Sequence, residues 1–212
     1  MVSLDFHKYR RDIARALFAQ KDSLLKDPLL TEEWDAFVAA WVAYALSQNG
    51  FQNNLPLEEL ANRLERWAAQ DSSWEWQRNL GPLAFYCWLR EHMGKPQDAS
   101  ITLRLSETVK RLNEDDKLSL LKDAEEVFLL ALGLRNIEEV RATLVAVAMA
   151  QMDKGPLKRR VLYVAALREM GENRPVPQMD PQDPGDVIAL VWCAERYPGE
   201  LRRDEEWQRL GN

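Results

Sequence analysis

Apolar residues recur at a helical period through most of the chain. In four stretches these residues stand three and four positions apart, which predicts amphipathic helices with one solvent-exposed face. The stretches are residues 56–70, 100–113, 136–151 and 183–197. Each follows a stretch that is apolar nearly all round, such as AEEVFLLALGL or PLKRRVLYVAALREM. A helix that is apolar nearly all round must be covered by other elements on several sides. We therefore expect buried helices and half-exposed helices to alternate along the chain.

Capping signals predict where these helices begin. Ser100 is the expected cap of the helix over 100–113, in which Leu105 and Val109 share one face. Asn136 and Glu139 stand at capping-box spacing before the next amphipathic stretch.

Glycines predict where the buried helices end. They stand at intervals of 44, 39 and 38 residues, and they are Gly50, Gly94, Gly133 and Gly171. Glycine just past the end of a helix commonly adopts the left-handed conformation that stops it. Two of the buried stretches also share short motifs: one contains GPL followed by LREHMG, and the other contains GPL followed by LREMG. A period of roughly 40 residues is near that of two-helix HEAT and armadillo-like units.

The spacing predicts an all-α fold of stacked antiparallel helical hairpins, a HEAT-like α-α superhelix of about ten helices. A compact multi-helix bundle is the structural alternative. We expect one continuous domain over residues 1–212, because no obvious linker divides the chain. It would contain terminal capping helices and four hairpins, near residues 31–70, 73–113, 117–152 and 155–197.

Charge and composition bear on the partners of this protein. The net charge of −6 and the pI of about 5.2 weigh against non-specific nucleic-acid binding, which needs a positive field, without excluding it. The longest wholly apolar run, residues 37–46, is too short to span a bilayer. The charged N-terminal segment is unlike a secretory signal, so we expect a cytoplasmic protein without membrane contact. Both cysteines lie in apolar helical runs, which is typical of reduced core residues.

Tryptophans and a basic turn supply the candidate interaction residues. Trp74 and Trp76 fall in one predicted helical turn but about 200° apart, so they cannot both face one core. We expect one of them to anchor a partner, since tryptophan is enriched at interface hot spots. A run of cations occupies a predicted helix start, where the helix dipole disfavours positive charge. The members of this run are Lys154, Lys158, Arg159 and Arg160.

Catalytic and cofactor motifs are not found in the sequence. It holds two histidines and two cysteines, too few at suitable spacings for a zinc site, and no P-loop or nucleophile-elbow motif. We therefore predict a non-enzymatic protein–protein interaction or scaffold module that needs no cofactor. Two alternatives stay open. One is an enzyme or small-ligand binder with a pocket between helices; the other is a nucleic-acid-associated subunit that uses the basic run together with Arg202 and Arg203. The sequence does not indicate an oligomeric state.

Overall fold

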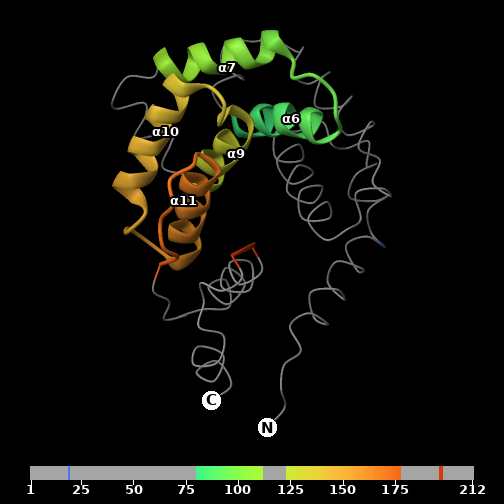
Figure 1. Ribbon diagram of the computed structural model, residues 1–212. Helices are drawn as coiled ribbons and strands as arrows, with labels where there is room; N and C mark the ends of the chain where they lie inside the picture. Colours follow the sequence, from blue (N-terminus) through green and yellow to red (C-terminus); the bar gives the residue numbers. More distant parts are fainter. Residues whose placement is uncertain (1–18, 20–79, 112–122, 178–195, 198–212) are drawn as a thin grey trace. The chain divides into compact units, whose positions relative to one another are not determined.

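The structure is a computed structural model that describes residues 19, 80–111, 123–177 and 196–197 (Figure 1). These residues form five helices and no strand: α6 (Leu80–His92), α7 (Ala99–Arg111), α9 (Ala124–Leu134), α10 (Glu138–Gln151) and α11 (Leu157–Glu169). The chain divides into two compact units, Met1–Leu105 and Ser106–Asn212, and each is described by itself. The single continuous domain and the terminal capping helices remain predictions.

The all-helical character is confirmed for the described residues, but the predicted stack of about ten helices is wrong. Five helices are found there, and one of the glycines on which the hairpin period depended is not a helix stop. Gly133 lies inside α9, where it is buried, and that helix ends at Leu134 with Arg135 still in the right-handed helical conformation. The predicted hairpin at 31–70 lies outside the described residues.

Helix α6 belongs to the first unit and is buried all round over most of its length. Ten consecutive residues, Leu80 to Leu89, are buried, as expected for a helix without a polar face. Trp88 is only 6% exposed and its ring stacks on His92 at 4.9 Å between centroids. Trp88 is therefore a core residue, as its position deep in an apolar run suggests.

Helix α7 begins differently from the prediction. The carboxylate of Asp98 accepts hydrogen bonds from the backbone N–H groups of Ser100 at 3.0 Å and Ile101 at 3.2 Å. Asp98 therefore caps the helix in place of Ser100, because a carboxylate can accept from two free N–H groups at once. The predicted inner face is confirmed by Leu105 and Val109, which are both fully buried.

Cys87 lies in α6 and touches the α7 residue Thr102, with 3.6 Å between Sγ and Oγ1. It is a free, buried cysteine, as the sequence predicts. Burial raises the pKa of the Cys87 thiol to about 11, although the hydrogen bond with Thr102 acts in the opposite direction. The thiolate is the reactive form, so the folded protein holds this sulfur in an inert state.

Alkylation at pH 8 is expected to modify Cys87 about 100-fold more slowly in the folded protein than in denaturant, or slower still. A thiol pKa of about 11 in place of the ordinary 9.0 lowers the thiolate fraction by about that factor, and burial blocks access further. Site-resolved mass spectrometry would follow the modification of this residue alone. Equal rates in the folded and unfolded protein would contradict the buried position of Cys87.

Helices α9, α10 and α11 belong to the second unit and pack together. Helix α11 contacts both of the others, and α10 also contacts α9. Helices α9 and α11 are buried nearly all round, from Val127 to Leu134 and from Val161 to Leu167. Helix α10 buries one stripe, made of Val140, Leu144 and Ala148. The predicted alternation of buried and half-exposed helices is thus confirmed for these three.

The starts of α9 and α10 differ in how they are capped. Asp123 caps α9 and accepts a hydrogen bond from the backbone of Glu125 at 3.0 Å. Helix α10 begins at Glu138 with Ile137 as its cap residue, without a side-chain cap, so the capping box predicted at Asn136 is wrong. Two glutamates in the first turn of α10 still complement the helix dipole.

The shared LREHMG and LREMG segments end α6 and α11 in the same way. Gly94 and Gly171 adopt the left-handed conformation, with φ of 70° and 86°, as predicted for helix stops. After each glycine the chain turns back over the helix end. Arg90 Nε donates to the Pro96 carbonyl at 2.9 Å, and Arg168 Nε donates to the Arg174 carbonyl at 2.8 Å. In both cases an arginine of the last turn fixes the segment that leaves the helix.

Replacing Gly171 with alanine is expected to lower the free energy of unfolding by about 1 kcal/mol. An added Cβ would meet no atom within 4 Å, so the cost comes from the positive φ alone. Asparagine tolerates this conformation better, so Gly171→Asn should cost less than Gly171→Ala. Urea unfolding followed by circular dichroism would measure both. A larger cost for asparagine would contradict the backbone origin of the effect.

Candidate functional site

Four of the six interaction residues predicted from the sequence can be located. Trp74 and Trp76 lie outside the described residues. Lys154 is exposed in the turn after α10, and Lys158, Arg159 and Arg160 lie in the first turn of α11. The basic run therefore lies at a helix start, as the sequence predicts, and its role in binding stays a prediction.

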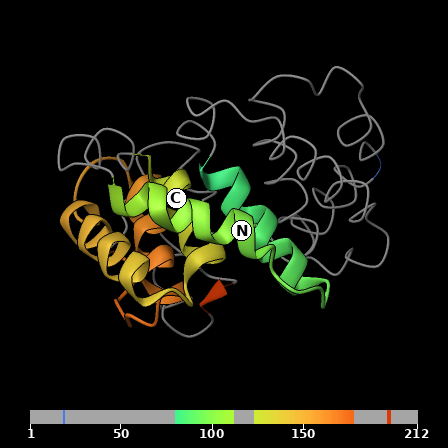
Figure 2. The same ribbon diagram turned by 90° about the horizontal axis from the view of Figure 1, so that it is seen from above.

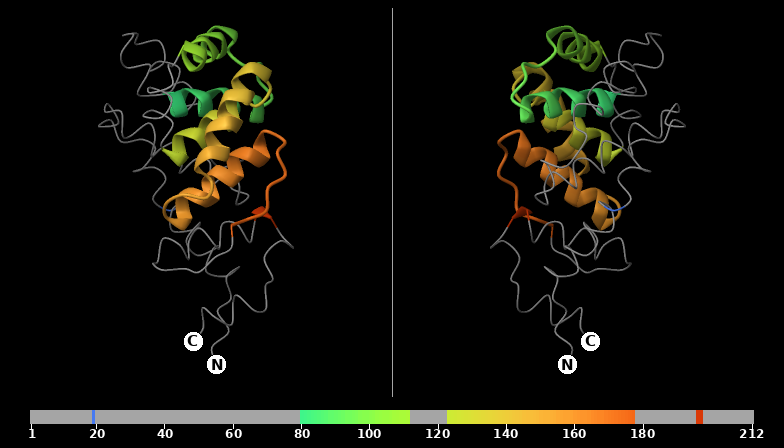
Figure 3. Two further views of the ribbon diagram at one scale, coloured as in Figure 1. Left: turned by 90° about the vertical axis from the view of Figure 1, so that its left-hand side faces the viewer. Right: turned by 90° about the vertical axis from the view of Figure 1, so that its right-hand side faces the viewer.

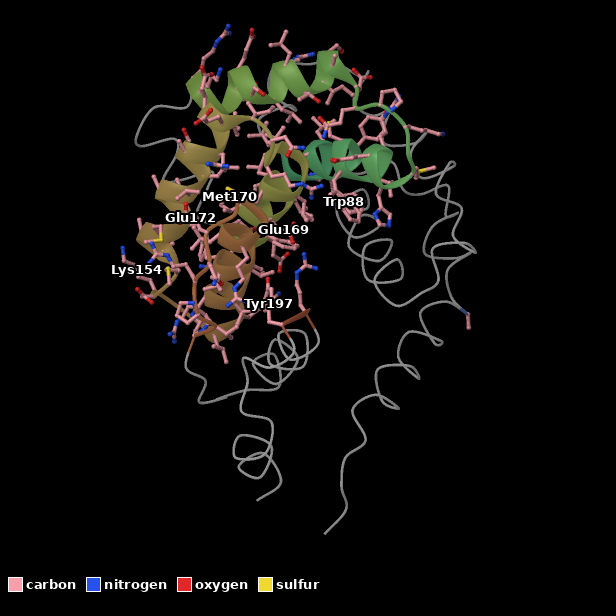
Figure 4. The ribbon with its side chains drawn as sticks, in the orientation of Figure 1. Trp88, Lys154, Glu169, Met170, Glu172 and Tyr197 are labelled. Carbon is pink, nitrogen blue, oxygen red and sulfur yellow. The ribbon has the colours of Figure 1, made fainter. Side chains whose placement is uncertain are left out.

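The cations of this turn face different surroundings. The ammonium of Lys158 lies 2.7 Å from the carboxylate of Glu125, in the first turn of α9. Arg159 is exposed, whereas Arg160 is only partly exposed and its Nε is buried without a hydrogen-bond partner. An acidic neighbour thus compensates the charge of Lys158. Figure 4 shows Lys154 beyond the end of α10.

A second charged cluster lies where α9 and α11 end. Glu169, the last residue of α11, is ion-paired with Arg196 and lies 3.7 Å from Arg135. The guanidinium of Arg168 stacks over the ring of Tyr197, 4.1 Å from its centroid. The side chains of Glu169 and Arg196 are each only 19% exposed. These contacts hold residues 196–197 against the helix ends, so we assign the cluster a structural role (Figure 4 labels Glu169 and Tyr197).

The outer face of α10 is the least expected surface in the second unit. The three buried residues of this helix share one side, and α9 and α11 lie together to one side of α10 in Figures 1 and 2. Figure 3 is seen along that direction, so α10 overlaps the other two helices there. On the opposite side a surface helix is normally charged or polar. Here that side is apolar between residues 142 and 150. It consists of Ala142, Val145, Ala146, Met149 and Ala150, which we call the α10 outer face.

Solvent reaches this face. Ala142, Ala146 and Ala150 are exposed, four residues apart, and Val145 and Met149 beside them are half-buried. Alanine is the strongest helix former, so exposed alanines alone would be explained by helix propensity. Valine is a poor helix former, and it shares the face. Propensity therefore accounts for the alanines but not for Val145.

Charged residues stand at both ends of the face: the N-terminal end is acidic, and the C-terminal end carries one residue of each sign. Glu138 and Glu139 are exposed at its N-terminal end, and Asp153 and Lys154 follow its C-terminal end. Glu139 is ion-paired with Lys110 of α7. An apolar centre with a charged rim is the general pattern of protein interfaces.

The sequence analysis did not predict this face, although the apolar residues that form it can be read directly from the sequence. The periodicity of ATLVAVAMA predicts a single buried stripe and a wet face on the other side. The second side is exposed but not polar. The low polarity of these nine residues is the signal that could have revealed the outer face. A helix covered on only one side is expected to carry polar residues on the other.

Other classes of site find no support in the described part of the chain. No three side chains among its His, Cys, Asp and Glu residues come close enough together to hold a metal ion. None of its helices combines the length and the apolar character that a membrane crossing requires. No protein-family model, curated protein or solved structure matches the chain.

Proposed function

We propose that this chain is a protein-binding module and that the α10 outer face is its contact surface. The observation that carries this proposal is the exposed apolar side of α10, which lies opposite the residues buried against α9 and α11. Covering such a face removes apolar surface from water, which is the main driving force of most protein association. Small side chains along the face also let a partner backbone approach closely.

The shape of this surface suits a helical partner. Alanines at positions 142, 146 and 150 form a shallow track along the helix, and Val145 and Met149 form one wall beside it. A partner helix with apolar residues three and four positions apart could lie along this track. The two glutamates at the N-terminal end would favour a partner with basic residues at that position.

Affinity capture from a lysate of the native host tests the proposal. The wild type would be compared with Ala146→Glu, which puts a charge in the middle of the face, and with Ala99→Glu. The control makes the same change at an exposed residue in the first turn of α7, where a glutamate suits the helix dipole. Circular dichroism would establish that all three proteins are folded.

We expect the wild type and Ala99→Glu to retain the same partner, and Ala146→Glu to lose it. A partner set shared by all three folded proteins would contradict the proposal. The pocket-containing enzyme and the nucleic-acid-associated subunit remain hypotheses.

A further inference from the structure

We propose that the occupant of the α10 outer face is a helix of another protein that carries a lysine or arginine at each end of its apolar stretch. This inference rests on the proposed function and names the class of partner for the same surface. Its basis is the position of two carboxylates in line with the apolar residues. Glu139 lies seven positions before Ala146 and Asp153 lies seven positions after it, at opposite ends of the face.

Both acidic residues lie on the same side of the helix as Ala146. Seven positions are nearly two turns, so at about 100° per residue each lies within about 20° of Ala146 around the helix axis. The helical path includes Asp153, because Met152 is still in the right-handed helical conformation and its N–H donates to the Ala148 carbonyl at 2.8 Å. A partner that covers the alanines therefore meets a carboxylate at each end.

These carboxylates are accessible to a partner. Asp153 is exposed. Glu139 is ion-paired with Lys110 of α7, but its side chain is 72% exposed and the pair is made by Oε2. A carboxylate accepts hydrogen bonds on both oxygens, so Oε1 of Glu139 can receive a second cation while the pair with Lys110 remains.

The spacing of the carboxylates sets the length of the partner site. Glu139 and Asp153 are 14 positions apart, which is about 21 Å along the axis at 1.5 Å per residue. Two helices that cross at Ala146 at the common angle of about 20° are displaced sideways by only about 4 Å at these ends. A lysine or arginine side chain spans that displacement. The two basic residues of the partner should therefore also stand about 14 positions apart.

The same charges weigh against other occupants. A second copy of this chain, related by a two-fold axis at Ala146, would place Glu139 of each copy beside Asp153 of the other and form two repulsive pairs. The carboxylates also repel phosphate groups, so nucleic acid and anionic lipid do not suit the face. Because both ends are negative, the face selects positive charge at a fixed spacing.

Selection from a library of helical peptides displayed on phage tests this inference. All members would share apolar residues three and four positions apart, and the positions that flank the apolar stretch would be randomised. The full chain would be the immobilised bait, and the peptides it retains would be sequenced. We expect enrichment of lysine or arginine at two positions about 14 apart on the apolar side of the peptide.

Charge reversal on the bait supplies the matched variant. With Asp153→Lys as bait, the selection should enrich aspartate or glutamate at one of the two positions and keep a basic residue at the other. A peptide selected on the wild type should bind Asp153→Lys about fivefold more weakly, because one attraction becomes a repulsion. The control is Glu91→Lys, the same charge change at an exposed residue in the last turn of α6, where a cation suits the helix dipole. It should bind that peptide as the wild type does.

Three results would overturn the basic helix as occupant. They are a selection that yields no binder, binders without basic residues at this spacing, and binders that a folded Asp153→Lys retains unchanged. If any of these occurs while Ala146→Glu loses a host protein in the capture experiment, the face has a partner of different chemistry and the proposed function stands. If Ala146→Glu also loses nothing, both the basic helix and the proposed function fail.

Discussion

Replacing Phe128 with alanine is expected to lower the free energy of unfolding by about 3–5 kcal/mol. Phe128 is fully buried in α9, which contacts both α10 and α11. Removing a buried aromatic ring forfeits its transfer free energy and leaves a cavity that neighbouring side chains only partly fill. Its ring also lies beneath the guanidinium of Arg196, 5.8 Å from the ring centroid, and that contact would be lost as well.

Urea unfolding followed by circular dichroism would measure this change. The matched control is Leu103→Ala, because Leu103 is 62% exposed on α7 and should cost no more than about 0.5 kcal/mol. Similar costs for the two variants would contradict the packing of the second unit. A cost for Phe128→Ala below about 1 kcal/mol would place the ring outside a closed core.

Replacing Glu169 with glutamine is expected to lower the free energy of unfolding by about 2 kcal/mol. Its carboxylate is paired with Arg196 and lies 3.7 Å from Arg135, so glutamine would deprive two guanidinium groups of this counter-charge. Arg135 is 28% exposed and Arg196 is 19% exposed, so water compensates part of the loss. Breaking a fully buried pair would cost more, about 3–5 kcal/mol.

The control for this prediction is Glu107→Gln. Glu107 pairs with Arg111 within α7 at 3.4 Å, and both side chains are at least half exposed. Ion pairs of this kind contribute about 0–1 kcal/mol, and salt screens them. Thermal unfolding at low and high salt would separate the two cases. The Glu169 prediction is wrong if both variants lose the same stability, or if salt removes the effect of Glu169→Gln.

Helices α9 and α11 could be predicted from sequence because burial all round requires an almost wholly apolar composition. Nine of the eleven residues of α9 are apolar or glycine, and the helix begins and ends where that run does. Single glycines are less informative about where a helix ends. Gly133 stops nothing, because a glycine inside a well-packed helix is held by the packing of its neighbours, and Gly94 and Gly171 adopt the expected left-handed conformation.

The capping prediction for α7 fails because two candidates stand close together. Asp98 and Ser100 both favour a helix start, and the stronger acceptor takes the position. The α10 outer face escaped prediction for a different reason. Val140 and Leu144, on the buried side, and Val145 and Met149, near the outer side, have the same chemistry, so only the positions of α9 and α11 decide which side is covered.

Photo-crosslinking from position 146 tests the contact role of the α10 outer face most directly. A photoreactive phenylalanine analogue would replace Ala146 in one protein and Ala99 in the control, and both would be irradiated in cells of the native host. We predict an abundant protein adduct from position 146 and none of that abundance from position 99. Equal, sparse labelling from both positions would show that the outer face of α10 faces only water, which contradicts its role as a contact surface.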